Sequence, residues 1–277
     1  MKIALAQINS ILGNLDKNLE IHVNYCEEAI NKKADVIVFP ELSLTGYSLK
    51  DLNLEVAVNT SLTKKLDKLK ELSKKLDIVC GFVEESDSYA LYNSSAYFSE
   101  GKIVHTHRKI YPPTYSLFEE FRYFSAGKKC DAFDTKFGRA GMLVCEDMWH
   151  LSLPYTLAMK DAKIIYGIAA SPTRMGVNTT EFKNYEINSE QHRTFARLLS
   201  LYFVFTNRVG YEDGVNFWGG SEIVDPFGNV VAAGKIFDEE LIFADIDMNE
   251  VRRARQSARH FNDENLDLTI NNLIDIE

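Results

Sequence analysis

The feature that most constrains the fold is an alternation of short apolar runs with longer amphipathic segments. Apolar runs of this length, separated by polar stretches, are typical of buried β-strands. The runs cover residues 3–8, 36–39, 78–83, 141–145, 163–169 and 202–206. Several of them are separated by enough chain to hold a helical crossover between parallel strands. The sequence therefore predicts an α/β protein.

The segments between these runs carry helical periodicity. Leu19, Val23, Cys26 and Ile30 recur at a spacing that puts them on one helix face. The leucines between residues 62 and 76 recur in the same way, and a third helix is expected from about residue 181 to 201. Each such helix would have one apolar face available to cover a sheet.

Two hairpins are also expected. Residues 90–107 are predicted to form strand, turn and strand, with Gly101 in the turn. Residues 221–233 place Pro226 and Gly228 where a tight turn needs them. Parallel units mixed with hairpins predict mixed sheets covered by helices, an α/β sandwich. Because there is no linker, repeat or low-complexity stretch, a single domain over residues 1–277 is expected.

Composition narrows the class of protein. The formal net charge of −9 argues against nucleic acid or an anionic membrane as a partner, since such binders need a positive footprint. Four cysteines without CxxC spacing predict neither a zinc site nor a disulfide framework, and they fit a reducing compartment. The first ten residues resemble a strand more than a signal peptide, and residues 198–205 are too short an apolar stretch to span a bilayer. A cytoplasmic location is therefore expected.

Glu41 is the first candidate for chemistry. An apolar strand is predicted to end at Phe39, Pro40 prevents further ladder bonding, and Glu41 follows at once. Loops after strand ends are where α/β folds place their sites. A carboxyl group against apolar residues is suited to proton transfer. The alternative is a glutamate held by backbone N–H groups with no catalytic part.

Lys109 is the second candidate, at the end of the strand that closes the first hairpin. A lysine there could hold a fixed positive charge beside a nucleophile or a developing oxyanion. Taken alone, it would be interpreted as a surface lysine. His105 and His107 alternate onto one strand face, but no thiol or carboxylate stands at metal-ligand spacing from them, so no metal site is expected.

Cys145 is the third candidate. It ends the run 141–145, and Glu146 and Asp147 open the next segment. A thiol at such a turn is expected to be partly exposed and close to backbone N–H groups that favour the thiolate. The other cysteines suit structural roles: one on an apolar helix face, one inside a strand and one in a polar loop, namely Cys26, Cys80 and Cys130.

Taken together, the stretches FPELSLTGY, HRKIYPP and VCEDMWH resemble the nitrilase or carbon–nitrogen hydrolase superfamily over essentially the whole chain. The resemblance implies a four-layer α-β-β-α sandwich with two mixed sheets, no cofactor and no metal. It also implies a catalytic triad of Glu41, Lys109 and Cys145, and the stretch FEEFRYF adds Glu120 as a second glutamate. Later landmarks fit as well: AASP around Ser171, NRVG at Asn207, and FWGGSEIVDPFGNVVA from Phe217.

Within the superfamily, PELSLTGYSLKDL and CEDMW look most like the glutaminase domain of glutamine-dependent NAD synthetases. There the positions matching Tyr47, Tyr115, Glu120, Trp149 and Ser171 line the amide pocket. Trp149 stands where the resemblance leads us to expect a phenylalanine. This difference affects which acyl groups the pocket is expected to accept. The sequence ends without an ATP-pyrophosphatase domain, so a stand-alone enzyme or a subunit of a larger assembly is expected.

The resemblance also implies a mechanism. Glu41 takes the proton of Cys145, the thiolate attacks an amide carbonyl, and Lys109 with the backbone N–H of Glu146 holds the oxyanion. Ammonia leaves, and water oriented by Glu120 releases the acid from a thioester. A small linear amide, either an ω-amide or glutamine, is the expected substrate.

Three other functions compete with independent hydrolysis. The thioester could pass to an amine or a phospholipid, but family members acting on lipids carry membrane helices. The chain could instead be a glutaminase subunit that supplies ammonia to a separate ATP-dependent synthetase such as NAD synthetase. A non-enzymatic interaction module is the third, and the intact Glu-Lys-Cys set argues against it. By analogy, a homodimer or larger homo-oligomer is expected.

Overall fold

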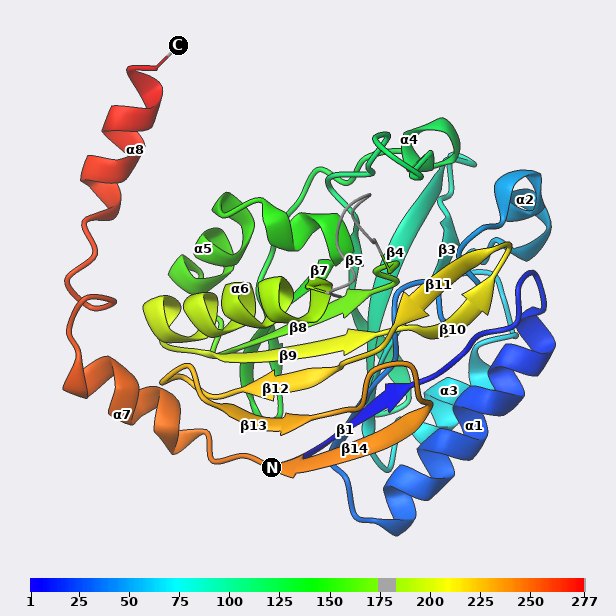
Figure 1. Cartoon of the computed structure of the whole chain (residues 1–277), viewed down its shortest axis with the longest axis horizontal. Coiled ribbons are helices and arrows are strands. Elements are labelled where there is room, and N and C mark those ends of the chain that lie inside the picture. Colours follow the sequence, from blue (N-terminus) through cyan, green and yellow to red (C-terminus); the bar gives the residue numbers. More distant parts are fainter. Residues whose placement is uncertain (174–182, 277) are drawn as a thin grey trace.

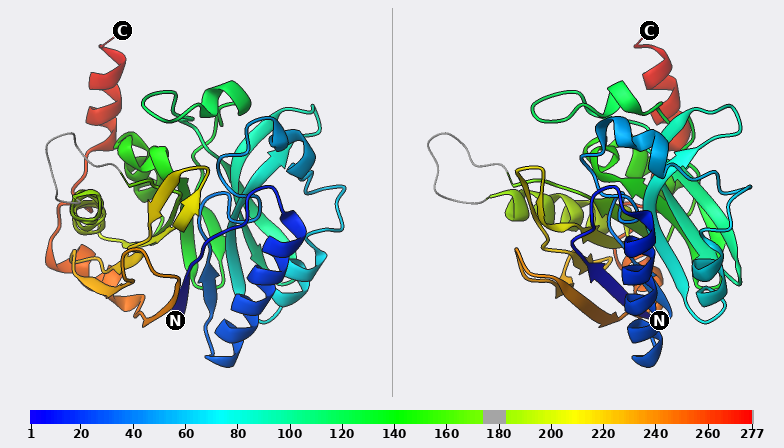
Figure 2. Two further views of the ribbon diagram at one scale, coloured as in Figure 1. Left: turned by 45° about the vertical axis from the view of Figure 1, so that its right-hand side comes forward. Right: turned by 90° about the vertical axis from the view of Figure 1, so that its right-hand side faces the viewer.

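In residues 1–173 and 183–276, which the computed structural model describes, two six-stranded sheets lie face to face. Helices cover their outer sides, which gives the four layers α-β-β-α (Figures 1 and 2). This is the architecture that the resemblance implied.

The first sheet is mixed. In spatial order it contains β14 (Glu240–Asp245), β1 (Lys2–Gln7), β2 (Val36–Val38), β3 (Asp77–Glu85), β4 (Leu91–Ser99) and β5 (Lys102–Arg108). Strands β1, β2 and β3 are parallel, and the outer pairs are antiparallel. The parallel centre therefore has antiparallel strands on both sides.

The second sheet repeats this plan. Its order is β13 (Val230–Ala233), β12 (Glu222–Val224), β9 (Tyr202–Asn207), β8 (Ile164–Ala169), β7 (Gly138–Val144) and β6 (Phe133–Thr135). Strands β7, β8 and β9 are parallel, with antiparallel partners at each side. A separate hairpin joins β10 (Val209–Glu212) to β11 (Val215–Trp218).

The helices divide between the two outer faces (Figure 1). Helices α1 (Leu15–Asn31) and α3 (Asp67–Leu72) lie on the first sheet, and α5 (Ser152–Met159) and α6 (Asn184–Leu199) on the second. Short elements stand at the ends of the strands: η1 (Lys50–Leu52), α2 (Asn53–Val56), α4 (Glu120–Tyr123) and η2 (Cys145–Trp149). Helix α7 (Asn249–Ser257) leads to α8 (Leu266–Ile274), which projects away from the sandwich (Figure 1).

The strand alternation explains how two cores form. In β1, Ile3 and Leu5 enter the core between the sheets, whereas Ala4 and Ala6 face the helices on the outside. The same period of two splits β2, where Ile37 faces outward. Because the central strands are buried on both faces, most of their positions are apolar and their polar residues lie near the ends, and this produced the short apolar runs in the sequence.

Most predicted elements are confirmed. The six runs correspond to β1, β2, β3, β7, β8 and β9, and both hairpins form as β4–β5 and β12–β13. Gly101 and Gly228 lie in the two turns at positive φ. Helix α1 forms as predicted, but its buried face is shifted: Leu15, Asn18, His22, Cys26 and Ala29 are buried. Of the predicted face only Cys26 is fully buried, and Leu19, Val23 and Ile30 lie partly buried at its edge. Helix α6 ends near the predicted position, while residues 181 and 182 of the predicted start lie outside the described residues.

The predicted helix over residues 62–76 is wrong in length. The structure has α3 only over Asp67–Leu72, with turns on both sides, and Leu62 is 81% exposed. Leu66, Leu69 and Leu76 are buried all the same, so the leucine spacing reported burial against the sheet and not a continuous helix. Within the described part of the chain, no helix is both long and apolar enough to cross a membrane.

Candidate active site

Three strand ends from the two sheets meet at one place. Glu41 follows β2 and Lys109 follows β5, both in the first sheet, whereas Cys145 follows β7 in the second. The Lys109 Nζ atom lies 2.8 Å from Glu41 Oε1, and the charges of both groups act on the Cys145 thiol. The structure thus brings together the three side chains that the sequence singled out.

The position of Glu41 depends on a close backbone approach. After β2 ends, the chain turns at Pro40 and crosses directly over β3 at Gly81. A Cβ atom at Gly81 would lie 2.4 Å from the backbone nitrogen of Leu42 and 2.8 Å from Glu41 Cα. Only glycine therefore allows this crossing, which turns the Glu41 side chain toward the space between the sheets.

Lys109 holds two carboxyl groups at once. Its Nζ atom donates to Glu41 Oε1 at 2.8 Å and to Glu120 Oε1 at 2.7 Å. Its side chain is fully buried, and its backbone N–H donates to the carbonyl of Asn93. An ammonium has three hydrogens, so one is left over from these two bonds and can be offered to a ligand.

Asn93 completes this cluster, and sequence reasoning missed it. Its Nδ2 atom donates to Glu41 Oε1 at 2.7 Å and to Glu120 Oε2 at 3.2 Å. The residue lies inside β4 and is fully buried. Asparagine is depleted in strand interiors, so its presence in the middle of a predicted strand was the signal available. Asn93 and Lys109 together fix both carboxyl groups from the same side.

Electrostatics in this cluster follow from one cation facing two acids. Burial alone would lower the pKa of the Lys109 ammonium, but the charges of Glu120 and Glu41 outweigh burial and raise that pKa well above its ordinary value. Burial raises the pKa of the Glu120 carboxyl, and the Lys109 charge opposes that rise. Lys109 therefore stays charged throughout the neutral and mildly alkaline range.

The second oxygen of Glu41 faces the other sheet. Glu41 Oε2 accepts a hydrogen bond of 2.7 Å from the backbone N–H of Ala170, just after β8. Each carboxylate oxygen can accept two hydrogen bonds, so Oε2 keeps one acceptor position. Oε1 already accepts from Lys109 and Asn93. Oε2 is therefore the oxygen available to take a proton from a ligand or a thiol.

Cys145 stands at a sharp turn with φ of 48°, a backbone region that costs energy for any residue other than glycine. Burial raises the pKa of its thiol well above the ordinary value, the Glu41 charge raises it further, and the Lys109 charge opposes both. The prediction of a partly exposed thiolate is therefore wrong for the resting protein, since Cys145 is only 9% exposed and its neutral form is favoured. Cys145 is not part of a disulfide, so its sulfur carries a proton that a base could remove.

A pocket of about 290 Å³ opens onto Cys145. Three of the five residues predicted to line the amide pocket do line it: Tyr115, Trp149 and Ser171. Glu146, whose backbone N–H was predicted to hold the oxyanion, lines it as well. Among the described residues, the lining also contains Phe118, Pro172, Asn184, Ile187 and Asn188. The Tyr115 hydroxyl donates to Glu146 Oε2 at 2.8 Å, while Tyr115 and Trp149 are each 49% exposed. The pocket thus has a half-exposed aromatic mouth above a thiol.

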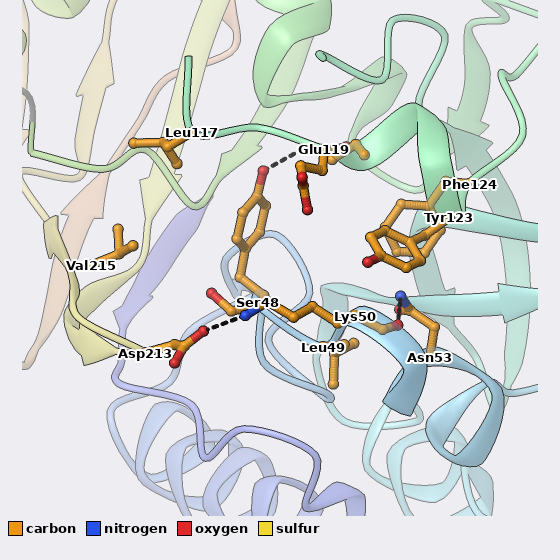
Figure 3. Close-up of a pocket in the computed structure, with 12 residues that line it drawn as sticks. Ser48, Leu49, Lys50, Asn53, Leu117, Glu119, Tyr123, Phe124, Asp213 and Val215 are labelled. Carbon is orange, nitrogen blue, oxygen red and sulfur yellow. Dashed lines mark hydrogen bonds and ion pairs between the residues drawn. The ribbon is translucent and has the colours of Figure 1, made fainter. Parts of the chain in front are cut away.

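Tyr47 and Glu120, the other two predicted pocket residues, line a neighbouring cavity of about 200 Å³ instead. Figure 3 shows Lys50 and Asp213 paired on one side of this cavity and Tyr123 and Phe124 on another. The Tyr47 hydroxyl donates to Glu120 Oε1 at 2.6 Å. Tyr47 therefore reaches the reacting groups through Glu120, from behind the cluster.

Within the part of the chain that the structure describes, neither His105 nor His107 belongs to a cluster that could hold a metal ion. His107 Nε2 lies 2.8 Å from Asp147 Oδ2, and the ring of His105 stacks on Phe133. Over the described residues, no group of three or more histidine, cysteine, aspartate or glutamate side chains is arranged to hold a metal ion.

Comparison with known proteins places this geometry in a family. A family model described as carbon–nitrogen hydrolase matches residues 2–256. The chain belongs to the carbon–nitrogen hydrolase family. A glutamine-dependent NAD(+) synthetase of Acinetobacter baylyi is 34% identical over 256 residues, which cover 91% of this chain and 45% of that protein. This carbon–nitrogen hydrolase thus spans a little under half the length of that curated relative.

Solved structures agree on the fold. Nit3 of Saccharomyces cerevisiae, a member of branch 10 of the nitrilase superfamily, is 26% identical with a TM-score of 0.80, and 93% of this chain covers 94% of that chain. A carbon–nitrogen hydrolase of Helicobacter pylori G27 has a TM-score of 0.88 at 23% identity, with 99% and 98% covered. The two mixed sheets of this hydrolase are therefore the nitrilase arrangement.

The wall behind Ser171 contains a residue that the sequence marked only as a landmark. Asn207, at the end of β9, accepts from the backbone N–H of Ser171 through Oδ1 at 2.8 Å and donates to the Gly219 carbonyl. The Ser171 hydroxyl accepts from Trp218 Nε1 at 3.0 Å. A buried amide at a strand end, within a matched motif, was the available signal. Asn207 thus holds one wall of the pocket in place.

Proposed function

We propose that this carbon–nitrogen hydrolase cleaves the C–N bond of a small linear amide, an ω-amide or glutamine itself, through a thioester on Cys145. The observation that carries the proposal is the convergence of Glu41, Lys109 and Cys145 from two sheets beneath one pocket. A thiol alone is a weak nucleophile when its neutral form dominates, and a buried base with a buried cation supplies what it lacks.

Acylation begins with proton transfer from the Cys145 thiol to Glu41 Oε2, the oxygen with a free acceptor position. The sulfur attacks the amide carbonyl carbon, a C–S bond forms, and the carbonyl electron pair moves onto oxygen. The remaining Lys109 hydrogen and the backbone N–H of Glu146 stabilise this oxyanion. As the intermediate collapses, Glu41 returns the proton to nitrogen, the C–N bond breaks, and ammonia leaves.

Deacylation reuses the same groups. Glu41 takes a proton from water, and the resulting hydroxide attacks the thioester carbon. Collapse breaks the C–S bond, the sulfur recovers its proton, and the carboxylic acid is released. Glu120, held by Lys109 and Tyr47, keeps the ammonium in place and helps to orient the water.

The size and lining of the pocket support a small substrate. A volume of about 290 Å³ lies near the lower limit of ligand pockets, and its described polar groups are two asparagines, a serine, a tyrosine and a glutamate. Trp149 lines the same pocket and is half exposed. These features suit a short acyl chain with a polar end better than a large aromatic amide.

An ammonia-release screen tests the proposal. Purified chain is incubated with short aliphatic amides, ω-amides including glutamine, N-carbamoyl compounds and nitriles, with Cys145→Ala as the matched control. We expect turnover of at least one small amide and none in the variant, whose circular dichroism spectrum should match the parent. Equal ammonia release by both proteins would overturn the assignment of the nucleophile.

A second candidate function follows from the relative. Glutamine-dependent NAD(+) synthetase of Acinetobacter baylyi shares 34% identity with this chain, which covers 45% of that protein. This supports a glutaminase subunit that feeds ammonia to a separate ATP-dependent synthetase. Glutaminase activity that rises severalfold on adding such a synthetase would favour it, whereas unchanged rapid turnover of glutamine would favour an independent amidase.

A further inference from the structure

Asp147 is a fully buried carboxylate two residues beyond Cys145, inside η2. None of the mechanism above uses it. A buried charge is costly unless hydrogen bonds surround it. The groups that form hydrogen bonds to Asp147 therefore indicate its role.

Both oxygens of Asp147 are occupied, and by different segments. Oδ1 accepts from the backbone N–H groups of Ile110 at 2.9 Å and Tyr111 at 3.0 Å. Oδ2 lies 2.8 Å from His107 Nε2 and accepts from the backbone N–H of Val144 at 3.2 Å. Three of these four donors flank Lys109, and the fourth immediately precedes Cys145.

These bonds cross between the sheets. His107 is on β5 in the first sheet, with Ile110 and Tyr111 just after it, whereas Val144 ends β7 in the second. Cys145 itself has the strained φ of 48°, which surrounding contacts must maintain. One carboxylate therefore joins the segment that carries the ammonium to the turn that carries the sulfur.

We propose that Asp147 is a positioning residue that sets the separation of Lys109 and Cys145 by holding their two backbone segments with one carboxylate. This inference rests on the proposed hydrolase function. Asp147 acts through the backbone and does not touch the substrate. Reactions in such sites depend steeply on placement, and a misplacement of about 1 Å can cost a hundredfold in rate.

An isosteric amide cannot replace the Asp147 carboxylate, because both carboxylate oxygens accept hydrogen bonds. The side chain of asparagine offers one acceptor oxygen, and its NH₂ group can only donate. If the single oxygen of the substituted amide faced Ile110 and Tyr111, the NH₂ would meet the N–H of Val144. The reverse orientation would leave Ile110 and Tyr111 without acceptors. Asp147→Asn therefore keeps the volume and releases one of the two segments.

The test compares Asp147→Asn with Asp134→Asn, which alters an exposed aspartate on β6. We expect Asp147→Asn to lower kcat about a hundredfold and to leave KM within about threefold, because the pocket mouth is unchanged. Asp134→Asn should leave both constants at the parent values. A normal kcat in folded Asp147→Asn, or a loss confined to KM, would overturn the proposal.

A second readout needs no turnover. Lys109 promotes the thiolate of Cys145, so loosening their separation in His107→Leu, which removes no carboxylate charge, should move the pH midpoint of Cys145 alkylation by iodoacetamide upward relative to His107→Gln. A purely structural role would lower Tm without moving this midpoint, and an unmoved midpoint would contradict the proposal. If no amide is turned over by the parent protein, the hydrolase assignment fails while this measurement still decides the role of Asp147.

His107 supplies variants in case Asp147→Asn does not fold. His107→Leu removes one donor to Asp147, and His107→Gln keeps a side-chain N–H at a similar reach. We expect kcat to fall about tenfold in the leucine variant and to recover to within about threefold of the parent in the glutamine variant. Equal kcat values in the two variants would count against the proposal.

Discussion

The floor and the mouth of the candidate site differ in burial, charge and hydrogen bonding. At the floor, Glu41, Lys109 and Asn93 are at most 1% exposed, and hydrogen bonds join all three. At the mouth, Tyr115 and Trp149 are about half exposed and belong to loops or short turns. The floor is thus rigid and charged, and the mouth is open and mostly aromatic.

This difference suggests a division of labour. Charges act strongly on one another in a dry interior, so the floor suits bond making and breaking. Half-exposed side chains at a mouth can vary without disturbing the core, so they suit the choice of amide. Changes at the floor should lower the rate with every substrate, whereas changes at the mouth should alter the ranking of substrates.

The largest expected effect comes from removing the cation at the floor. Lys109→Met should lower kcat at least about a hundredfold with any amide, because the oxyanion loses its charged donor and two carboxyl groups lose their partner. Steady-state ammonia release measures this. Lys102→Met, at the exposed far end of β5, is the control and should be silent. A loss that varied strongly between substrates would break the comparison.

The two charged groups at the floor, Glu41 and Lys109, should also shift the pKa of the Cys145 thiol in opposite directions. The Glu41 charge raises the pKa of Cys145 and the Lys109 charge lowers it. Glu41→Gln should therefore lower the pH midpoint of thiolate formation, and Lys109→Met should raise it. The ultraviolet absorbance of the thiolate, followed against pH, records both. Shifts of the same sign would contradict the geometry.

Asn93 should show a smaller effect of the same kind. Asn93→Ala removes two hydrogen bonds to carboxyl groups, and about 1.5 kcal/mol of lost alignment corresponds to roughly a tenfold fall in kcat. Asn271→Ala on exposed α8 is the matched control. The fall should be the same for two different amides, as expected for a residue of the floor.

The smallest effect belongs to the mouth. Trp149→Phe trims a half-exposed ring, and we expect kcat to stay within about twofold for the preferred amide while the relative kcat/KM of a bulkier amide rises about threefold. Tyr89→Phe, on a remote exposed turn, should leave the ranking unchanged. An equal fall for every amide in Trp149→Phe would place the residue with the floor instead.

The sequence predicted the strand ends well and the connections between them poorly. Central strands are apolar over most of their length because both faces are buried, so the apolar runs located β1, β2 and β7 directly. The strand ends in turn located Glu41 and Cys145. The length of α3 was overestimated, because leucines that lie in turns and are buried can have the same spacing as leucines on one face of a helix.

The charge state of the thiol and the hydrogen bonds around it could not be read in advance. A thiolate was expected from the local turn alone. Burial and the charge of Glu41 raise the pKa of the Cys145 thiol, and both come from segments far away in the sequence. Asn93 was missed for a similar reason. Its side chain matters through Glu41 and Glu120, which lie 52 and 27 positions away along the chain. Such partners become neighbours only when the first sheet and the segment that follows β5 have folded.

Two adjacent residues after β8 couple the proton acceptor to the shape of the pocket. The N–H of Ala170 holds the base, and the next residue, Ser171, forms part of the pocket wall. Reshaping the pocket at Ser171 to admit a larger acyl group would therefore also displace Glu41, the proposed general base. Anyone redesigning this enzyme for a new amide would do better to create space on the side of Trp149, where no such link to the proton acceptor exists among the described contacts.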